Sequence, residues 1–130
     1  MVRFLALSNV LRIHERGIND FGGIHGTRDE KMLDSAINVA KATFGGEYLH
    51  KTIPEMAAAY AFHICQNHPF LDGNKRVALA SSVVFLNANG FELTCSNESA
   101  YIQILGVASG TVTKGELTSF YEEFAVPTRG

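Results

Sequence analysis

The most constraining feature of this 130-residue sequence is a pair of apolar segments, residues 56–65 and 77–86, separated by a short polar stretch. The first reads MAAAYAFHIC and the second VALASSVVFL, so small or apolar residues occur on every side of each segment. A helix that is apolar all round is buried in a protein core or in a membrane. Neither segment approaches the ~20 apolar residues of a membrane span. Both are therefore predicted to be central, buried helices of a globular protein.

Helix-start patterns recur along the chain, each with a threonine followed three residues later by glutamate. The two side chains of such a pair can cap each other's end of the opening helical turn. The pattern occurs at residues 27–30, 52–55 and 113–116. Behind the first, apolar residues repeat at helical spacing, namely Leu33, Ile37, Ala40 and Phe44. They predict an amphipathic helix that ends at Gly45-Gly46.

The remaining segments complete an all-α assignment. Helices are predicted over about 8–16, from Asn74 to a glycine stop at Gly90, from Ser96 or Asn97 to about Ser109, and from Thr113 to Ala125. Residues 91–94 alternate briefly and predict a short strand, whereas residues 43–52 are typical of an exposed flap or loop. The length fits one domain spanning 1–130. We expect a compact bundle of about six helices with at most a small flap or hairpin.

Composition and charge narrow the function classes. The apolar fraction of 46% and the charged fraction of 18% are ordinary globular values. The formal net charge of −2 provides no overall positive field for holding nucleic acid. The N-terminal apolar stretch is too short for a signal peptide, so a cytoplasmic location is expected. Cys65 and Cys95 fit neither a paired metal spacing nor a disulfide framework, and the histidines show no zinc-binding spacing.

The polar stretch between the two apolar segments concentrates His68, Asp72, Asn74, Lys75 and Arg76 within nine residues. A helix that begins near Asn74 would direct its free N–H groups and the positive end of its dipole toward the preceding loop. Such a helix start binds anions, and phosphate in particular. A carboxylate in the same loop suits a divalent cation that accompanies the phosphates, because Mg²⁺ prefers one or two carboxylates together with phosphate oxygens and water. The stretch therefore predicts a site for a nucleotide with its metal.

The other residues of the stretch have separate predicted roles. Gly73 lacks the Cβ that would obstruct a phosphate, Lys75 adds a mobile charge, and Arg76 adds a rigid fork of donors. His68 is the side chain best suited to accept a proton from an incoming hydroxyl at neutral pH. Phe70 is predicted to be a structural anchor. Each residue alone is ordinary, as a turn, a cap or a solvated face, but their combination between two apolar helices points to a transferase.

The segment H-P-F-L-D-G-N-K-R resembles the motif of the Fic/Doc superfamily. In the wider Fic branch a glycine usually follows the asparagine, and a second arginine follows three positions after the first. This chain has Lys75 and Leu79 at those positions, which is similar to the death-on-curing (Doc) branch, the toxins of toxin-antitoxin modules. The resemblance extends to residues 21–26, to the helix end at 86–90 and to Ser109-Gly110, and so covers most of the chain.

The resemblance implies roles for the motif residues. His68 would be the base that activates a target hydroxyl, and Asp72 the Mg²⁺ ligand. Gly73, Asn74, Lys75 and Arg76 would bind the phosphates of ATP, and Phe70 would anchor the loop in the core. One departure is Gln66, which stands where some Doc chains carry an arginine that contacts phosphate.

The resemblance also implies an activity and partners. Doc-type toxins transfer the γ-phosphate of ATP to a Ser or Thr hydroxyl of a translation factor such as elongation factor Tu, and so inhibit translation. Transfer of AMP, as in Fic enzymes, and a catalytically weak partner-binding module are the alternatives. The self-inhibiting helix of some Fic proteins is not matched, because Phe124 follows the correctly spaced Ser119 and Glu123. We therefore expect a separate antitoxin as partner, with neither nucleic acid nor a membrane bound directly.

Overall fold

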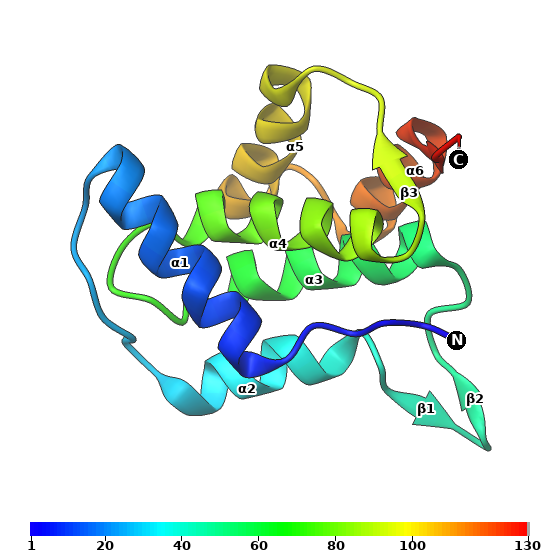
Figure 1. Cartoon of the computed structure of the whole chain (residues 1–130), viewed down its shortest axis with the longest axis horizontal. Helices are drawn as coiled ribbons and strands as arrows, with labels where there is room; N and C mark the ends of the chain where they lie inside the picture. Colours follow the sequence, from blue (N-terminus) through cyan, green and yellow to red (C-terminus); the bar gives the residue numbers. More distant parts are fainter. Residues whose placement is uncertain (130) are drawn as a thin grey trace.

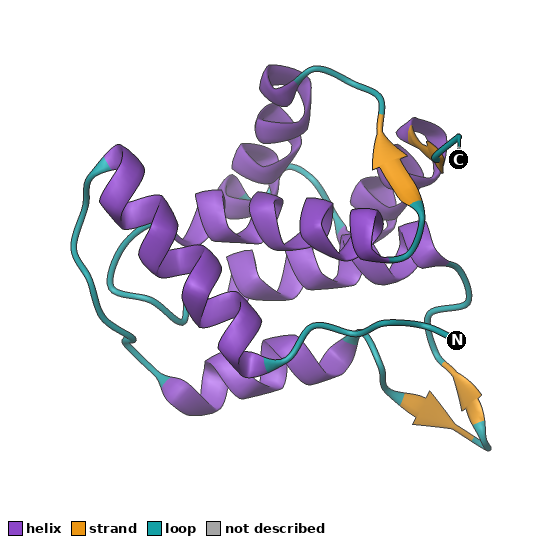
Figure 2. Cartoon of the chain, viewed as in Figure 1, coloured by secondary structure: helices purple, strands orange, loops and turns teal. Residues whose placement is uncertain are grey.

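The computed structural model describes residues 1–129, which form six helices and two small two-stranded antiparallel sheets (Figures 1 and 2). The elements are α1 (Leu7–Phe21), α2 (Glu30–Val39), β1 (Thr43–Phe44), β2 (Glu47–Tyr48), α3 (Ile53–Asn67), α4 (Asn74–Ala88), β3 (Phe91–Leu93), α5 (Asn97–Ser109), α6 (Lys114–Phe124) and β4 (Ala125–Pro127). The predicted all-α bundle of about six helices with a small hairpin is confirmed.

Helices α3 and α4 lie side by side at the centre of the bundle, as their all-round apolar sequences predict (Figure 1). Every residue from Met56 to Ala61 is buried, and on α4 the buried set includes Val77, Ala78, Phe85 and Leu86. Helix α1 packs on α4 and α2 packs on α3, while α5 contacts both central helices and α6 packs mainly on α3. The polar loop 68–73 joins these two core helices directly and is fixed at both ends by the core.

Two of the three predicted helix starts are confirmed. The Thr52 hydroxyl caps α3 by accepting from the Glu55 N–H at 3.1 Å, and Thr113 and Glu116 cap each other at the start of α6. The first pattern is wrong by two residues, because Asp29 is the cap of α2 and accepts from the Met32 N–H at 3.1 Å. Thr27 instead forms an isolated β-bridge with Phe70. Tertiary pairing with the polar loop has displaced the local capping pattern.

The predicted end of the second helix is also wrong. Helix α2 stops at Val39, and Phe44 lies on β1 with 80% of its surface exposed. Gly45 and Gly46 have φ values of 61° and 84° and form the two-residue turn between β1 and β2. Consecutive positive φ angles are typical of hairpin turns, whose twist matches that of the flanking strands. The pair of glycines therefore forms the turn of a hairpin and does not end a helix.

Helix α1 continues to Phe21, beyond its predicted end near Arg16. It passes through Gly17, where an added Cβ would lie 3.4 Å from Cδ of Arg76. The glycine thus gives the Arg76 side chain room against α1. At the other end of the chain, β3 pairs with β4 in antiparallel register, with Leu93 opposite Ala125. No helix within residues 1–129 is both long and apolar enough to cross a membrane.

A group of basic side chains lies between α3 and the start of α6. Nζ of Lys114 is 3.0 Å from Nε2 of the buried His50. Nε2 of His63 is buried without a hydrogen-bond partner among residues 1–129. Burial, followed by the charges of Lys114 and His50, lowers the pKa of His63 to about 4. Burial and Lys114 also lower the pKa of His50, an effect that the Glu55 carboxylate partly opposes. The fold therefore holds His63 neutral at neutral pH.

This arrangement predicts acid sensitivity of the fold. Between the ordinary pKa of 6.5 and about 4, the unfolded chain binds a proton at His63 that the folded chain does not bind. The free energy of unfolding should therefore fall as the pH falls through this window. His63→Leu should reduce the fall, measured by urea unfolding at about pH 7 and about pH 5. His25→Leu, on an exposed loop, is the control, and an unchanged pH dependence in the His63 variant would exclude His63 as the cause.

Candidate active site

The end of α3 turns the chain sharply at His68. This residue has φ 48° and ψ 53° and is the one non-glycine residue within 1–129 with a positive φ. Its N–H donates to the Ile64 carbonyl at 3.3 Å, which closes the last helical turn. A left-handed conformation costs a non-glycine residue ~1–3 kcal/mol, and such strain is frequent at functional sites. The turn leaves His68 exposed, while the following Pro69 is buried.

The segment before α2 holds this turn from outside. Arg28 donates from Nε to the His68 carbonyl at 2.7 Å and from Nη2 to the Asn67 carbonyl at 3.0 Å. The main-chain N–H groups of Arg28 and Asp29 both donate to the Pro69 carbonyl, at 2.7 and 3.0 Å. A guanidinium at a helix C-terminus also complements the negative end of the helix dipole. Arg28 is a supporting residue that the sequence pattern does not reveal.

Phe70 and Asn74 close the loop on itself. Oδ1 of Asn74 accepts from the Phe70 N–H, and Nδ2 of Asn74 donates to the Phe70 carbonyl, both at 2.9 Å. The Phe70 ring is fully buried and stacks on the His14 imidazole, with a centroid separation of 3.9 Å. Nε2 of His14 in turn lies 2.9 Å from the Asp72 carbonyl oxygen. The buried side chain of Asn74 therefore holds the loop together, while its main-chain N–H belongs to the first turn of α4.

The Asp72 carboxylate is exposed and held in place by main-chain donors. Oδ2 accepts from the Ile24 N–H at 3.1 Å and Oδ1 from the Gly73 N–H at 2.8 Å. These two hydrogen bonds, reinforced by the charge of Arg76, lower the pKa of Asp72 and keep it ionised. A Cβ on Gly23 would lie 2.7 Å from Oδ2 of Asp72, so only glycine leaves room for the carboxylate there.

The start of α4 presents main-chain donors at the same place. Gly73 has φ 76° and precedes the helix without a side-chain cap. The N–H groups of Asn74, Lys75 and Arg76 belong to the first helical turn, where no intrahelical acceptor exists. The Gly73 N–H, expected from the sequence to contact phosphate, already donates to Asp72. The first turn of α4 therefore offers an anion three amides at the positive end of a helix dipole.

These groups surround one small pocket of about 190 Å³. Its lining consists of His68, Leu71, Asp72, Gly73, Asn74, Lys75, Arg76 and Tyr101. All the predicted site residues line it except Phe70, which is buried. Tyr101 comes from α5 and was not identified from the sequence, because only tertiary packing brings α5 to the loop. The pocket fits an ionised phosphate chain with Mg²⁺, because its single carboxylate leaves the other metal ligands to phosphate oxygens and water.

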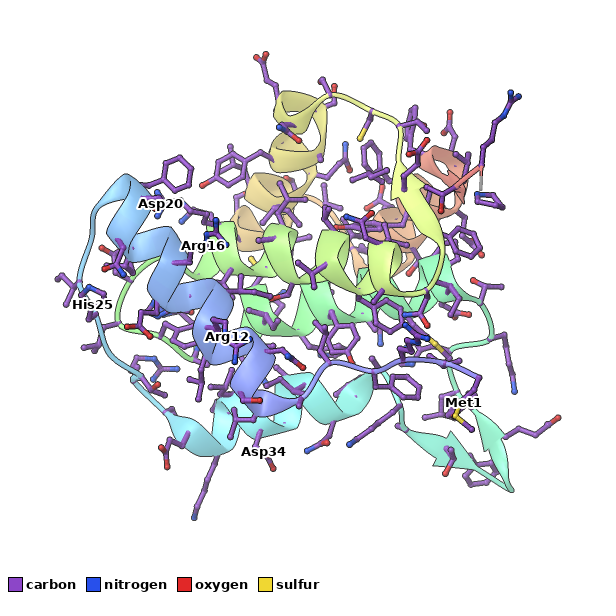
Figure 3. The ribbon with its side chains drawn as sticks, in the orientation of Figure 1. Met1, Arg12, Arg16, Asp20, His25 and Asp34 are labelled. Atoms are coloured by element: carbon purple, nitrogen blue, oxygen red, sulfur yellow. The ribbon has the colours of Figure 1, made fainter. Side chains whose placement is uncertain are left out.

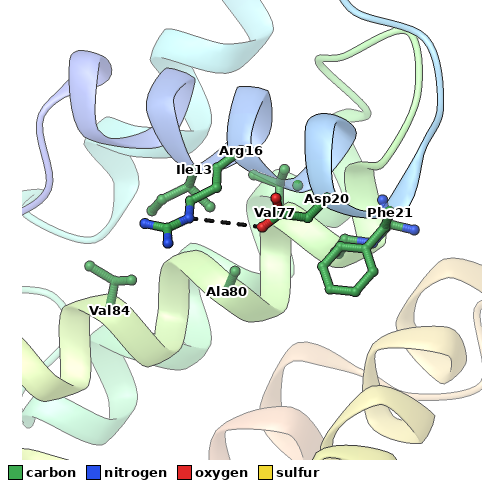
Figure 4. Close-up of a pocket in the computed structure, with 9 residues that line it drawn as sticks. Ile13, Arg16, Asp20, Phe21, Val77, Ala80 and Val84 are labelled. Atoms are coloured by element: carbon green, nitrogen blue, oxygen red, sulfur yellow. Dashed lines mark ion pairs between the residues drawn. The ribbon is translucent and has the colours of Figure 1, made fainter.

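Other parts of the surface are less suited to this chemistry. A larger groove of about 300 Å³ lies between α1 and α4 and is lined mainly by apolar side chains such as Ile13 and Val84 (Figure 4). His25 lies on the connection between α1 and α2 and points away from the helices (Figure 3). Residues 1–129 contain no group of three or more His, Cys, Asp or Glu residues that could hold a metal ion by themselves.

The helical fold and the pocket at the loop between two core helices can now be compared with known proteins. The model of the Fic/DOC family matches residues 4–86, which is more than half of the chain. This chain therefore belongs to the Fic/DOC family.

The chain is also similar to two named proteins. The protein named "Protein kinase doc" from Escherichia phage P1 is 29% identical over 112 residues, which cover 86% of this chain and 87% of the phage protein. The protein named "Toxin Doc" from Mycolicibacterium smegmatis is 38% identical over 73 residues, which cover 56% of each chain.

The Asn74–Phe70 contact predicts a large effect of Asn74→Ala on stability. The substitution leaves the buried N–H and C=O of Phe70 without partners, and each unsatisfied group costs about 1–3 kcal/mol. We expect the free energy of unfolding, measured by urea denaturation, to fall by about 2–4 kcal/mol. Asn87→Ala, at an exposed position of the same helix, should change it by less than about 0.5 kcal/mol. Equal losses in the two variants would contradict the role assigned to Asn74.

Proposed function

We propose that this protein is a Doc-like toxin that transfers the γ-phosphate of ATP to a Ser or Thr hydroxyl of a target protein. The observation that carries the proposal is the pocket itself, in which an exposed imidazole, an ionised carboxylate and the first turn of α4 converge. A base, a metal ligand and a phosphate-binding helix start are the parts that phosphoryl transfer to a hydroxyl requires. The likeness to a phage protein named as a kinase supports the same activity.

In this mechanism, His68 accepts the proton of the target hydroxyl while the hydroxyl oxygen attacks the γ-phosphorus. The bond between the γ-phosphorus and the bridging oxygen of ATP breaks, and ADP leaves. Asp72 would hold Mg²⁺, which neutralises charge on the phosphates. The first-turn amides of α4, with Lys75 and Arg76, bind the phosphate oxygens and keep the phosphorus in line with the hydroxyl. Imidazole is suited to the proton transfer because its ordinary pKa lies near neutrality.

The choice of phosphate rests on Lys75 and Leu79. Lys75 lines the pocket and adds charge and bulk where the wider Fic branch has glycine. Leu79, one turn after Arg76, packs against the hydrophobic core. The second cation that helps to hold the β- and γ-phosphates during AMP transfer is therefore replaced by an apolar side chain. We infer that the inner phosphates are held in the pocket and the γ-phosphorus faces His68, with AMP transfer as the alternative.

The proposed biological role is inhibition of translation, with a translation factor such as elongation factor Tu as target and a cognate antitoxin as the restraining partner. The likeness to a mycobacterial protein named as a toxin supports this role. On α6, Ser119 and Glu123 are followed by Phe124 and do not form the self-inhibiting pattern of some Fic proteins. Restraint is therefore assigned to a separate chain.

ATP labelled at either the α- or the γ-phosphorus tests the proposal. The purified protein, incubated with Mg²⁺ and elongation factor Tu, should transfer the γ label to the target and leave the α label in solution. His68→Ala should lower the transfer rate by about 10²–10⁴-fold, as expected for loss of a positioned general base, without loss of folding. Protein-bound α label would establish AMP transfer instead, and transfer of neither label would favour the binding-module alternative.

The metal role of Asp72 has its own test. Asp72→Asn keeps an oxygen that can accept from the Ile24 N–H but removes the charge that attracts a cation. We expect the dependence of ATP affinity on Mg²⁺ concentration, measured by calorimetry without target protein, to disappear together with transfer. Asp34→Asn, on the exposed face of α2, is the control. An Asp72 variant that needs the same Mg²⁺ concentration as the parent would exclude this carboxylate as the ligand.

A further inference from the structure

The side chain of Arg76 is held by helix α1. Its Cζ lies 4.9 Å from the centroid of the Phe21 ring, so the guanidinium rests on the aromatic face. Its Cδ packs beside Gly17 of α1, where an added Cβ would lie 3.4 Å from it. Arg76 lines both the phosphate pocket and the groove between α1 and α4, and Phe21 lines the groove. The guanidinium therefore sits at the boundary between the two cavities.

Phe21 is unusually exposed for an aromatic residue. It is the last residue of α1, Gly22 follows it with φ 87°, and 71% of its surface is accessible. Figure 4 shows its ring at the end of the groove, beyond the Arg16–Asp20 pair. Burial in the core does not account for a phenylalanine at this position. Its packing partner on α4 is the arginine at the mouth of the pocket.

An aromatic partner suits an arginine that must bind phosphate. A carboxylate partner would neutralise the guanidinium and occupy its N–H donors, which phosphate also needs. A ring beneath the guanidinium attracts the cation through its π face and leaves the in-plane donors free. Asp20 also lines this groove, but its Oδ2 pairs with Nε of Arg16, at 3.9 Å, and not with Arg76. Arg76 takes part in no ion pair within residues 1–129.

We infer that Phe21 is a positioning residue, whose ring holds the Arg76 guanidinium ready for the phosphates of ATP. The inference rests on the proposed function, because it assumes a phosphate ligand in the pocket. A long arginine side chain loses rotamer freedom when it binds a ligand, and an arginine already held in place loses less. Helix α1, which contributes no residue of the sequence motif, thereby sets part of the nucleotide affinity.

Two variants separate the ring face from simple bulk. Phe21→Leu keeps an apolar side chain but removes the π face, whereas Phe21→Tyr retains it. Calorimetry with ATP and Mg²⁺, without target protein, should give an affinity about 2- to 5-fold weaker for the leucine variant, as expected for a cation–π contact at an exposed site. The tyrosine variant should bind as the parent does. Phe44→Leu, another exposed phenylalanine on the hairpin at the opposite end of α3, is the control (Figure 1).

A double-mutant cycle with Arg76→Gln tests whether Phe21 acts through Arg76. In that background Phe21→Leu should have little further effect on ATP affinity, because the cation that the ring holds is gone. A loss that persists in full there, or a leucine variant that binds ATP as the parent does, would overturn the inference while leaving the proposed function intact. A folded parent protein that fails to bind ATP would overturn the proposed function and this inference with it.

Discussion

The two hydrogen bonds between the Asn74 side chain and the Phe70 main chain are the constraint on which the site depends. They close a loop of five residues across the gap between the central helices and draw Phe70 into the core. With that ring and the neighbouring Pro69 buried, the residues that flank them, His68 on one side and Leu71 and Asp72 on the other, lie at the surface. His68 and Asp72 are therefore exposed because of a contact in which neither takes part. Packing of Phe70 in the hydrophobic core thus fixes the positions of the polar side chains of the loop.

The fold could be predicted where one local signal had a single interpretation. Helices α3 and α4 are apolar on every side and too short in apolar sequence to span a membrane, so burial at the centre of the protein is the arrangement that satisfies them. The end of α2 could not be predicted, because Phe44 continues the helical repeat by coincidence and Gly45-Gly46 can end a helix or begin a hairpin turn. The length of α1 was missed for a related reason. A glycine at position 17 is typical of a helix end, but here it lies within α1, where the lack of a side chain leaves space for Arg76.

The candidate site likewise contains residues that could be predicted from the sequence and residues that could not. The residues that line the pocket from the loop are contiguous in sequence, so their residue types and spacing suffice to find them. Arg28 and Tyr101 come from elsewhere, and only the packing of α2 and α5 against the central pair brings them to the loop. Asn74 also has a structural role that the sequence does not reveal. Its side chain is committed to the loop before any ligand arrives.

The left-handed backbone of His68 has a consequence for how such a protein can be improved or can diverge. At this φ glycine would be the more comfortable residue, and selection for stability alone would favour it. The histidine imposes a conformational penalty that the Arg28 contacts and the core helices offset. Redesign for stability alone would thus tend to replace this histidine first. A lineage released from selection for activity would be expected to lose its imidazole there while keeping the scaffold.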